Sequence, residues 1–285
     1  MNMCGKGDAP VEEQEQASQA KPQDQGERGE SQEAARPRHA VPKPGSVPWD
    51  EDPETAMSLM LSRHAVRNFT DEPIDQQTRE ALQREVRRGN EAGRLHMCLA
   101  WDEPEAFDSR LAHYGNFSGV HNYLVIAGPA DKGLEARAGY FGERVVLLAQ
   151  QLGLNSCWVA MSYKRRLVRA SLPKGDRLVI VVALGHGTTE GKMHPCKSAP
   201  QVSKPAINVP AWFTRGVEAA LLAPTAMNQQ GFWITLTGRR DLQSRDIVQI
   251  QPGGGPCAKI DAGIARLHFE LGAGEKNFAW QDNLL

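Results

Sequence analysis

The chain has 285 residues, 40% of them hydrophobic, and 33 basic residues against 34 acidic ones give it a formal net charge of -1. This length allows one large core or two small ones, and the near balance of charge excludes the strong single-sign field typical of proteins that bind nucleic acid or anionic membranes. The expected partner is therefore a small molecule, with no nucleic acid and no membrane.

Cysteine usage and hydropathy indicate the compartment. The five cysteines are widely spaced and form no C-x-x-C pair: Cys4, Cys98, Cys157, Cys196 and Cys257. This pattern favours a reducing compartment over a disulfide framework. No run approaches the roughly 18 apolar residues that a membrane helix needs, and the N-terminus lacks the apolar stretch of a signal peptide. We therefore expect a cytoplasmic protein.

Residues 1–48 contain no Leu, Ile or Phe, only three Val, and six Pro among many polar residues. Such a composition cannot bury enough apolar surface to offset the entropy of ordering. We predict a disordered tail over residues 1–48 and a folded domain over residues 49–285. The alternative is that this acidic, Gln-rich tail recruits a partner.

The first part of the folded domain predicts alternating helices and strands. Apolar residues indicate a helix from residue 54 to about 63 and another over 75–88. Apolar runs predict strands over 95–101 and 123–127, the second closed by Gly-Pro.

Two later segments are expected to form the core. Phe141, Val145, Leu148 and Leu152 fall at offsets of 0, 4, 7 and 11, which places them on one face of a helix that ends near Gly153. The run over 178–184 is continuously apolar and rich in β-branched residues, as in a central strand that is buried on both faces.

The last third repeats this order in abbreviated form. A helix is predicted over 212–222, a strand over 232–236, and a helix in which Ile260, Ile264, Leu267 and Leu271 repeat the same four offsets. The recurrence indicates two related halves, about 54–205 and 206–275, although alternating elements also arise by chance.

Two segments carry residues suited to a ligand. In the first, S-R-H-A-V-R-N-F over 62–69, Arg63 and Arg67 lie four residues apart beside a helix end, and guanidinium groups suit phosphate oxygens. In the second, A-P-T-A-M-N-Q-Q over 223–230, a hydroxyl, amides and a proline-fixed backbone could bind a planar ring with N–H and C=O groups. The alternatives are two solvated arginines and a polar connection that caps a helix.

Together these two segments resemble the flavin-binding signatures of the nitroreductase family, R-R-S-x-R-x-F and A-P-S-x-x-N-x-Q-P-W. The stretch L-G-L-N-S-C-W-V-A over 152–160 and the strand and basic loop over 182–198 resemble two further family segments. The resemblance covers roughly residues 54–275. It implies an α+β fold of three layers, with a central mixed β-sheet flanked by helices.

The order of the motifs is similar to that of the TM nitroreductase branch, in which two family-like halves in one chain imitate the usual homodimer. The second motif lies near residue 224 here, whereas in ordinary members it follows the arginine segment by about thirty residues. When the two halves are aligned with an offset of 136 residues, residues 224–230 correspond to residues 88–94. These read R-G-N-E-A-G-R and do not contain the second motif. The resemblance therefore implies one flavin mononucleotide (FMN) per chain and a monomer.

The resemblance also assigns roles to single residues. Arg63 and Lys197 match positions that bind the flavin phosphate, and Arg67 matches one beside N1 and the C2 carbonyl of the ring. The remaining contacts would come from Pro224, Thr225, Asn228 and Gln230 at the ring, and from the backbone of Trp158, Val159 and Ala160 near N5. Ala65 stands where the family usually has a phosphate-binding serine, and Ala199 replaces a common basic residue. Phosphate affinity is therefore expected to be lower.

The implied function is that of an FMN-dependent flavoprotein oxidoreductase. It would pass electrons from NADH or NADPH to a small-molecule acceptor, such as a nitroaromatic or a quinone, by ping-pong hydride transfer. The flavin performs the chemistry, so no catalytic side chain is assigned. The alternatives are a flavin-binding member of the fold without turnover, which the two alanines favour, and a specialised enzyme with one metabolite as acceptor.

Three further features of the sequence do not indicate a functional site. His194 and Cys196 are too few, and wrongly spaced, for a metal site, so no metal is expected. His268 is interpreted as a packed or capping histidine, and Cys157 as a buried, unreactive thiol.

Overall fold

The computed structural model describes residues 50, 52–108, 115–205, 208–281 and 284–285. All of them belong to the unit Ala40–Leu285, and the fold below is that of this unit alone. The tail predicted over residues 1–48 lies outside the described residues.

The first two helices begin at aspartate caps. Helix α1, Pro53–Ser62, follows Asp52, whose side chain accepts a hydrogen bond from the Thr55 amide at 3.0 Å. Helix α2, Gln76–Gly93, follows Asp75, which accepts from the Thr78 amide at 3.0 Å. Each carboxylate satisfies an amide that lacks a partner in the first turn. Both predicted helices are confirmed, and α2 extends past its predicted end at residue 88.

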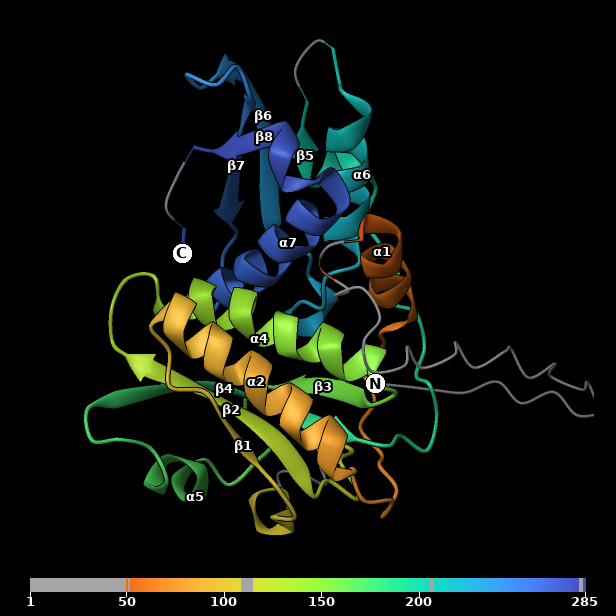
Figure 1. The fold of residues 1–285 in the computed structure, drawn as a ribbon, viewed down its shortest axis with the longest axis vertical. Coiled ribbons are helices and arrows are strands. Elements are labelled where there is room, and N and C mark those ends of the chain that lie inside the picture. The colour runs from red at the N-terminus through yellow and green to blue at the C-terminus, as the bar shows by residue number, and fades with distance from the viewer. Residues whose placement is uncertain (1–49, 51, 109–114, 206–207, 282–283) are drawn as a thin grey trace, which may run out of the picture. The chain divides into compact units, whose positions relative to one another are not determined.

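Four strands form the first sheet. They are β1 (Cys98–Ala100), β2 (Asn122–Pro129), β3 (Asn155–Val159) and β4 (Asp176–Gly185). The sheet has the order β1-β2-β4-β3, and every pairing is antiparallel. Helix α4, Leu134–Gln151, lies with α2 across one face of this sheet (Figure 1). A one-turn helix, η1 (Pro104–Ala106), and α5 (Arg165–Ala170) lie in connections.

Alternate residues of the central strands enter separate cores. On β4, Val182 and Leu184 pack in the cluster that contains α2 and α4, whereas Val181 and Ala183 pack in a second cluster with Phe69. Successive side chains of a strand point to opposite faces, so β4 is buried on both sides. The central strand predicted over 178–184 is confirmed.

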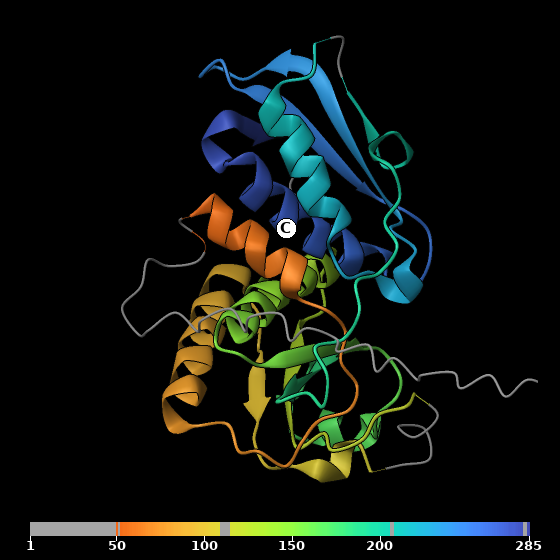
Figure 2. The ribbon, with the colours of Figure 1, turned by 90° about the vertical axis from the view of Figure 1, so that its right-hand side faces the viewer.

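Four more strands form a second sheet. They are β5 (Ser203–Lys204), β6 (Phe232–Arg240), β7 (Asp246–Pro252) and β8 (Phe278–Trp280), in the order β5-β6-β7-β8. The outer pairs are parallel and the β6–β7 pair is antiparallel. Helices α6 (Ala211–Leu221) and α7 (Ala258–Ala273) cover one face of this sheet (Figure 2). The remaining one-turn helices are η2 (Ala199–Gln201), η3 (Ala226–Asn228) and η4 (Glu275–Asn277).

Glycines bring α4 and α7 into close contact. A Cβ on Gly139 would lie 2.1 Å from the carbonyl oxygen of Ile260, and a Cβ on Gly263 would lie 2.0 Å from that of Ala136. Each helix therefore places a glycine against the backbone of the other. The contact joins the first sheet's helices to those of the second.

The α+β class, with sheets flanked by helices, is confirmed. The strands form two four-stranded sheets, one antiparallel and one mixed, where one central mixed sheet was expected. Strands β3, β5, β7 and β8 and helix α5 were not predicted. In the described part of the chain, no helix combines the length and apolar character that crossing a bilayer requires.

Candidate functional site

The arginine segment lies along β3, an edge strand of the first sheet. The Val66 amide donates to the Ser156 carbonyl at 3.0 Å, and Ala65 and Ser156 form a parallel bridge. Gly191 is close to the same segment, since a Cβ there would lie 3.2 Å from the Ala65 carbonyl oxygen. Residues 63–67, strand β3 and the loop over 187–198 are therefore neighbours.

Hydrogen bonds join the second motif to that loop. The Gln230 side chain accepts from the Lys197 amide at 2.8 Å and donates to the Pro195 carbonyl at 2.8 Å. Asn228 also donates to Pro195 at 2.8 Å, and the Lys197 ammonium group donates to the Gln230 carbonyl at 3.3 Å. The four sequence segments that resemble family motifs thus meet in one region.

The loop over 224–230 has an unusual backbone. Met227, Asn228 and Gln230 have φ values of 54°, 54° and 44°, in the left-handed region that non-glycine residues rarely occupy. Such strain persists only where surrounding contacts fix the backbone, and it gathers at ligand sites. Two contacts fix this one: the Gln230 amide donates to the Thr225 hydroxyl at 3.0 Å, and the Ala226 amide donates to the Asp261 carboxylate at 3.1 Å.

The predicted site residues differ in exposure. Ala65, Arg67, Ala160 and Lys197 are exposed; Trp158, Pro224, Thr225 and Asn228 are half-buried; Arg63, Val159 and Gln230 are buried. Gln230 is saturated within the protein, because its amide also donates to Asn228 Oδ1 at 2.8 Å. Its predicted contact with the ring stays a prediction; the described contacts make it the residue that fixes two loops to each other.

Arg63 lies in a buried cluster. Its side chain is 3% exposed, and Nε lies 3.8 Å from Oε1 of Glu143, which is fully buried. Nε has no hydrogen-bond acceptor among the described residues. Burial lowers the pKa of Arg63, and the Glu143 charge opposes this effect. The phosphate contact assigned to Arg63 is untested, and the charge that it faces in this structure is that of Glu143.

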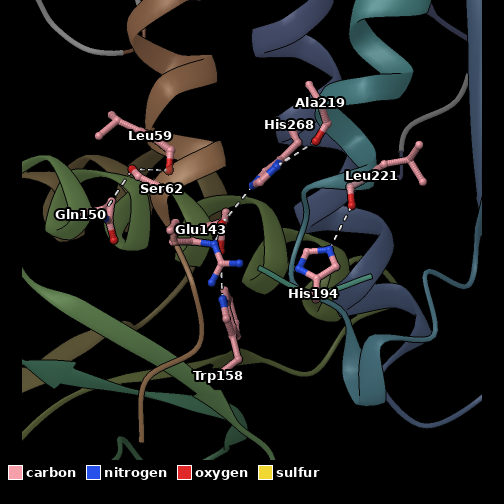
Figure 3. Close-up of polar contacts among 10 residues, drawn as sticks. Leu59, Ser62, Glu143, Gln150, Trp158, His194, Ala219, Leu221 and His268 are labelled. Atoms are coloured by element: carbon pink, nitrogen blue, oxygen red, sulfur yellow. Dashed lines mark hydrogen bonds and ion pairs between the residues drawn. The ribbon is translucent and has the colours of Figure 1, made fainter. Parts of the chain in front are cut away.

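Glu143 connects three elements (Figure 3). Its Oε2 accepts from Trp158 Nε1 at 2.9 Å, and its Oε1 lies 3.0 Å from Nε2 of His268, which is also fully buried. Nδ1 of His268 lies 3.1 Å from the Ala219 carbonyl oxygen. A carbonyl oxygen only accepts, so Nδ1 donates to Ala219, and the ring connects α6 to Glu143 of α4. The interpretation of His268 as a packed histidine is confirmed.

Two side chains of the loop over 187–198 share one backbone acceptor. His194 Nε2 donates to the Leu221 carbonyl at 3.1 Å, and Cys196 Sγ lies 3.4 Å from the same oxygen. Burial lowers the pKa of His194. Burial also raises the pKa of the Cys157 thiol, against the Arg67 and Arg63 charges, and the prediction that this thiol is buried is confirmed.

Sequence reasoning missed Glu143 and Asp261. A weak signal existed for Glu143, because Gly139 and Tyr140 precede it, and Val146 and Leu147 follow it, at helical spacing. A carboxylate on such an apolar face needs a buried partner. Asp261 carried no comparable signal, since an acidic residue in the first turn of a helix is usually explained by the helix dipole.

A family model described as Putative TM nitroreductase matches residues 55–273. Among solved structures, a Thermotoga maritima protein described as a putative nitroreductase is 19% identical, covering 77% of this chain and 84% of its own, with a TM-score of 0.53. An FMN-dependent nitroreductase from Clostridium difficile is 14% identical over 48% of this chain and 90% of its own, with a TM-score of 0.41. An NADPH:FMN oxidoreductase from Vibrio harveyi is 17% identical over 49% of this chain and 71% of its own, with a TM-score of 0.40.

No curated protein matches the chain. The likeness to the Thermotoga maritima structure shows a shared fold at low identity. Since the family model extends from α1 to the end of α7 and includes all four motif segments, the chain belongs to the TM nitroreductase family.

Proposed function

We propose that this protein is an FMN-dependent oxidoreductase that passes electrons from NADH or NADPH to nitroaromatic, quinone or similar planar acceptors. Family membership supports the general class. The observation that carries the proposal is the meeting of the four motif segments, which are far apart in the sequence. The Val66–Ser156 and Gln230–Lys197 hydrogen bonds join them in two pairs, and the Thr188 amide, which donates to the Asn68 carbonyl at 2.9 Å, connects the pairs.

The donors in this region fit a flavin nucleotide. Arg67 and Lys197 place positive charges at the surface, as an anionic phosphate and an electron-accepting ring require. The strained loop over 224–230 offers Thr225 and Asn228 as hydrogen-bonding side chains beside these charges. When bound, the flavin would accept a hydride and pass it on, while the protein supplies position and electrostatics.

The residues divide into two groups under this proposal. Arg67, Lys197, Thr225, Asn228 and the backbone of 158–160 would contact FMN. Arg63 and Gln230 would support the site without contacting FMN. Arg63 faces Glu143, and Gln230 forms hydrogen bonds with the loop over 194–197. The backbone at Trp158 is held by its indole bond to Glu143.

Exposed methionines favour broad acceptor specificity. Met161, Met193 and Met227 are all exposed, and each lies within or next to a segment of the candidate site. Methionine side chains are flexible and polarizable, so they adapt to planar ligands of different outline. Nitroaromatics and quinones are proposed as representatives of this class.

The test is to incubate the purified chain with FMN, desalt it, and record the flavin absorption before and after anaerobic addition of NADH or NADPH. Retained flavin that bleaches is the expected result. Retained flavin that bleaches with neither nucleotide would instead support the second candidate, a flavin-binding protein without turnover. Ala65 and Ala199 favour this candidate, because they remove two phosphate contacts usual in the family. No retained flavin would contradict both.

The phosphate contact of Lys197 is tested separately. Lys197→Ala should weaken FMN binding and leave riboflavin binding unchanged, because riboflavin lacks the phosphate. Lys204→Ala is the control, since this exposed lysine lies on β5 outside the four segments. Equal losses for FMN and riboflavin would contradict a phosphate role.

We further propose that one chain binds one FMN and acts as a monomer. Residues 88–94 lack the motif found at 224–230, so one complete set of motifs is present. Light scattering should give a mass near 31.3 kDa, and titration should give one FMN per chain. A mass of twice this value, or two flavins, would overturn the proposal.

A further inference from the structure

A cavity of about 650 Å³ lies apart from the four motif segments. Helices α2 and α4 form one wall, and α7 and β8 form the other; Arg245 and the C-terminal residue Leu285 also line it. Its volume is in the usual range for small-molecule pockets.

Arg266 of α7 lines this cavity and has a donor without an acceptor among the described residues. The residue is 9% exposed, and its Nε donates to Glu270 Oε1 at 3.2 Å. Its Cζ lies 4.6 Å from the ring centroid of Trp280. Its Nη1 is buried, and no described residue accepts a hydrogen bond from it. A buried guanidinium N–H without an acceptor is costly, so this group favours a ligand with an acceptor oxygen.

Glu270 does not meet this demand, because it accepts from Nε of Arg266 and not from Nη1. Its Oε1 also accepts from Trp280 Nε1 at 2.7 Å, and its Oε2 accepts from the Tyr140 hydroxyl at 2.5 Å. The carboxylate thus receives three donors from three elements. Nη1 of Arg266 still has no acceptor among the described residues.

The other arginines of the cavity are engaged by acidic side chains. Arg88 contacts Glu85 at 3.3 Å, Arg144 contacts the same Glu85 at 2.7 Å and Asp50 at 2.5 Å, and Arg245 contacts Asp241 at 2.7 Å. Their charges are therefore largely offset. Recognition is expected to depend on the directed bond to Arg266 rather than on a general positive field.

Aromatic side chains define the shape of the ligand. Phe141 of α4 lines the cavity on one side, and Phe278 and Trp280 of β8 line it on the other. Phe278 and Trp280 meet edge to face with ring centroids 5.1 Å apart, which fixes the orientation of both rings. A planar apolar body suits these walls.

We propose that this cavity binds a planar aromatic carboxylate. The carboxylate accepts a hydrogen bond from the Arg266 guanidinium, and the ring packs against Phe141 and Trp280. This site lies outside the four motif segments, and the proposal does not depend on FMN binding or turnover.

The test is isothermal titration of the full chain, loaded with FMN where it retains it, with 1-naphthoate and with the neutral 1-naphthamide. We expect one 1-naphthoate per chain, bound roughly tenfold more tightly than the amide, because the amide carbonyl still accepts a hydrogen bond but lacks the charge that strengthens it. Equal affinities, or no binding of 1-naphthoate, would overturn the proposal.

Variants locate the bound molecule. Ala92→Trp places an indole in the cavity from an exposed position on α2 and should abolish binding. Glu91→Trp adds the same group at the neighbouring exposed position, which does not line the cavity, and should preserve binding. Arg67→Ala should also preserve it, whereas loss in this variant would place the naphthoate at the candidate flavin site and contradict the proposal.

Arg266→Gln tests the donor directly. It should remove the preference for 1-naphthoate over 1-naphthamide, provided that circular dichroism shows a native fold. If this variant does not fold, the Ala92→Trp and Glu91→Trp pair decides the question. An unchanged preference in folded Arg266→Gln would overturn the role of Arg266.

Discussion

The indole Nε1 of Trp158 donates to the Glu143 carboxylate at 2.9 Å and ties the edge strand β3 to helix α4. The same carboxylate meets His268 of α7 at 3.0 Å and faces Arg63 at the end of α1. Glu143 therefore contacts two of the segments proposed to surround the flavin, one through Trp158 and the other through Arg63. This acid lies where α4 and α7 pack together.

Glu143→Ala should destabilise the fold by about 3–5 kcal/mol, because it leaves the buried Arg63 charge without compensation and removes the acceptor of Trp158. Urea denaturation measures the change. Glu135→Ala on the same helix is the control: its ion pair with Arg177, at 3.2 Å, is partly exposed and should contribute at most about 1 kcal/mol. Similar losses for the two variants would contradict the special position of Glu143.

Arg67→Ala should leave the free energy of unfolding within about 0.5 kcal/mol of the parent, because the side chain is exposed. Under the proposed function it should slow flavin reduction by NADH or NADPH. The exposed charge is worth about 1 kcal/mol, so the flavin midpoint potential should fall by roughly 20 mV. Arg67→Lys keeps the charge and should retain most of the potential. Unchanged reduction kinetics in Arg67→Ala would remove its assigned role.

Asp261 should make the free energy of unfolding depend on pH, and the sign of this dependence follows from its pKa. Burial raises its pKa to about 6, against the Ala226 hydrogen bond, which lowers it. Between about pH 4 and pH 6 the folded protein keeps a proton that the unfolded chain releases, so the free energy of unfolding falls as pH rises through this window. Asp261→Asn keeps an acceptor for Ala226 and cannot ionise. It should be about 1–3 kcal/mol more stable than the parent above pH 6.

Asp241→Asn is a control of opposite sign. The pKa of Asp241 is lowered: burial opposes this shift, and hydrogen bonds from Arg245 outweigh it. Its ionised form therefore stabilises the fold above the unfolded pKa, and this variant should lose stability at neutral pH. Chemical denaturation at a series of pH values compares the two variants. A loss of stability in Asp261→Asn at neutral pH would contradict the assignment.

Hydrophobic periodicity explains which elements were predictable. Helices α4 and α7 and strand β4 have long apolar patterns, and the structure confirms all three. Strand β3 follows closely on α4 with the mixed sequence N-S-C-W-V, and β8 has three residues that pair with β7, so neither has a distinct local pattern. Periodicity also indicates only which face of a strand is buried. It does not specify which strands pair, so the division into two sheets was missed.

Contacts in the candidate site could not be predicted from local sequence patterns either. Its motif residues were identified by resemblance, but their contacts depend on side chains that are distant in sequence. The resemblance assigned Arg63 to the flavin phosphate, and nothing near it in the chain indicates that Glu143 lies 3.8 Å away. Gln230 was assigned to the ring, whereas its amide is bound to Pro195 and Lys197. A sequence motif specifies which residues gather at a site, and tertiary packing decides which of them face the ligand.

The last prediction concerns the two adjacent glutamines of the strained loop. Gln230 is buried and its amide donates to Pro195 and Asn228, so Gln230→Glu replaces two donations by repulsion between a carboxylate and two acceptor oxygens. Gln229 is exposed, and Gln229→Glu adds the same charge one residue away. Gln230→Glu should cost about 2–3 kcal/mol of stability, and Gln229→Glu less than about 0.5 kcal/mol, because only the first leaves buried groups unsatisfied. Urea denaturation measures both, and fluorescence titration should show weaker FMN binding in Gln230→Glu alone. If both variants bound FMN like the parent, the connection between the 194–197 and 224–230 loops would not matter for the flavin, and the proposed site would lose the contact that assembles it.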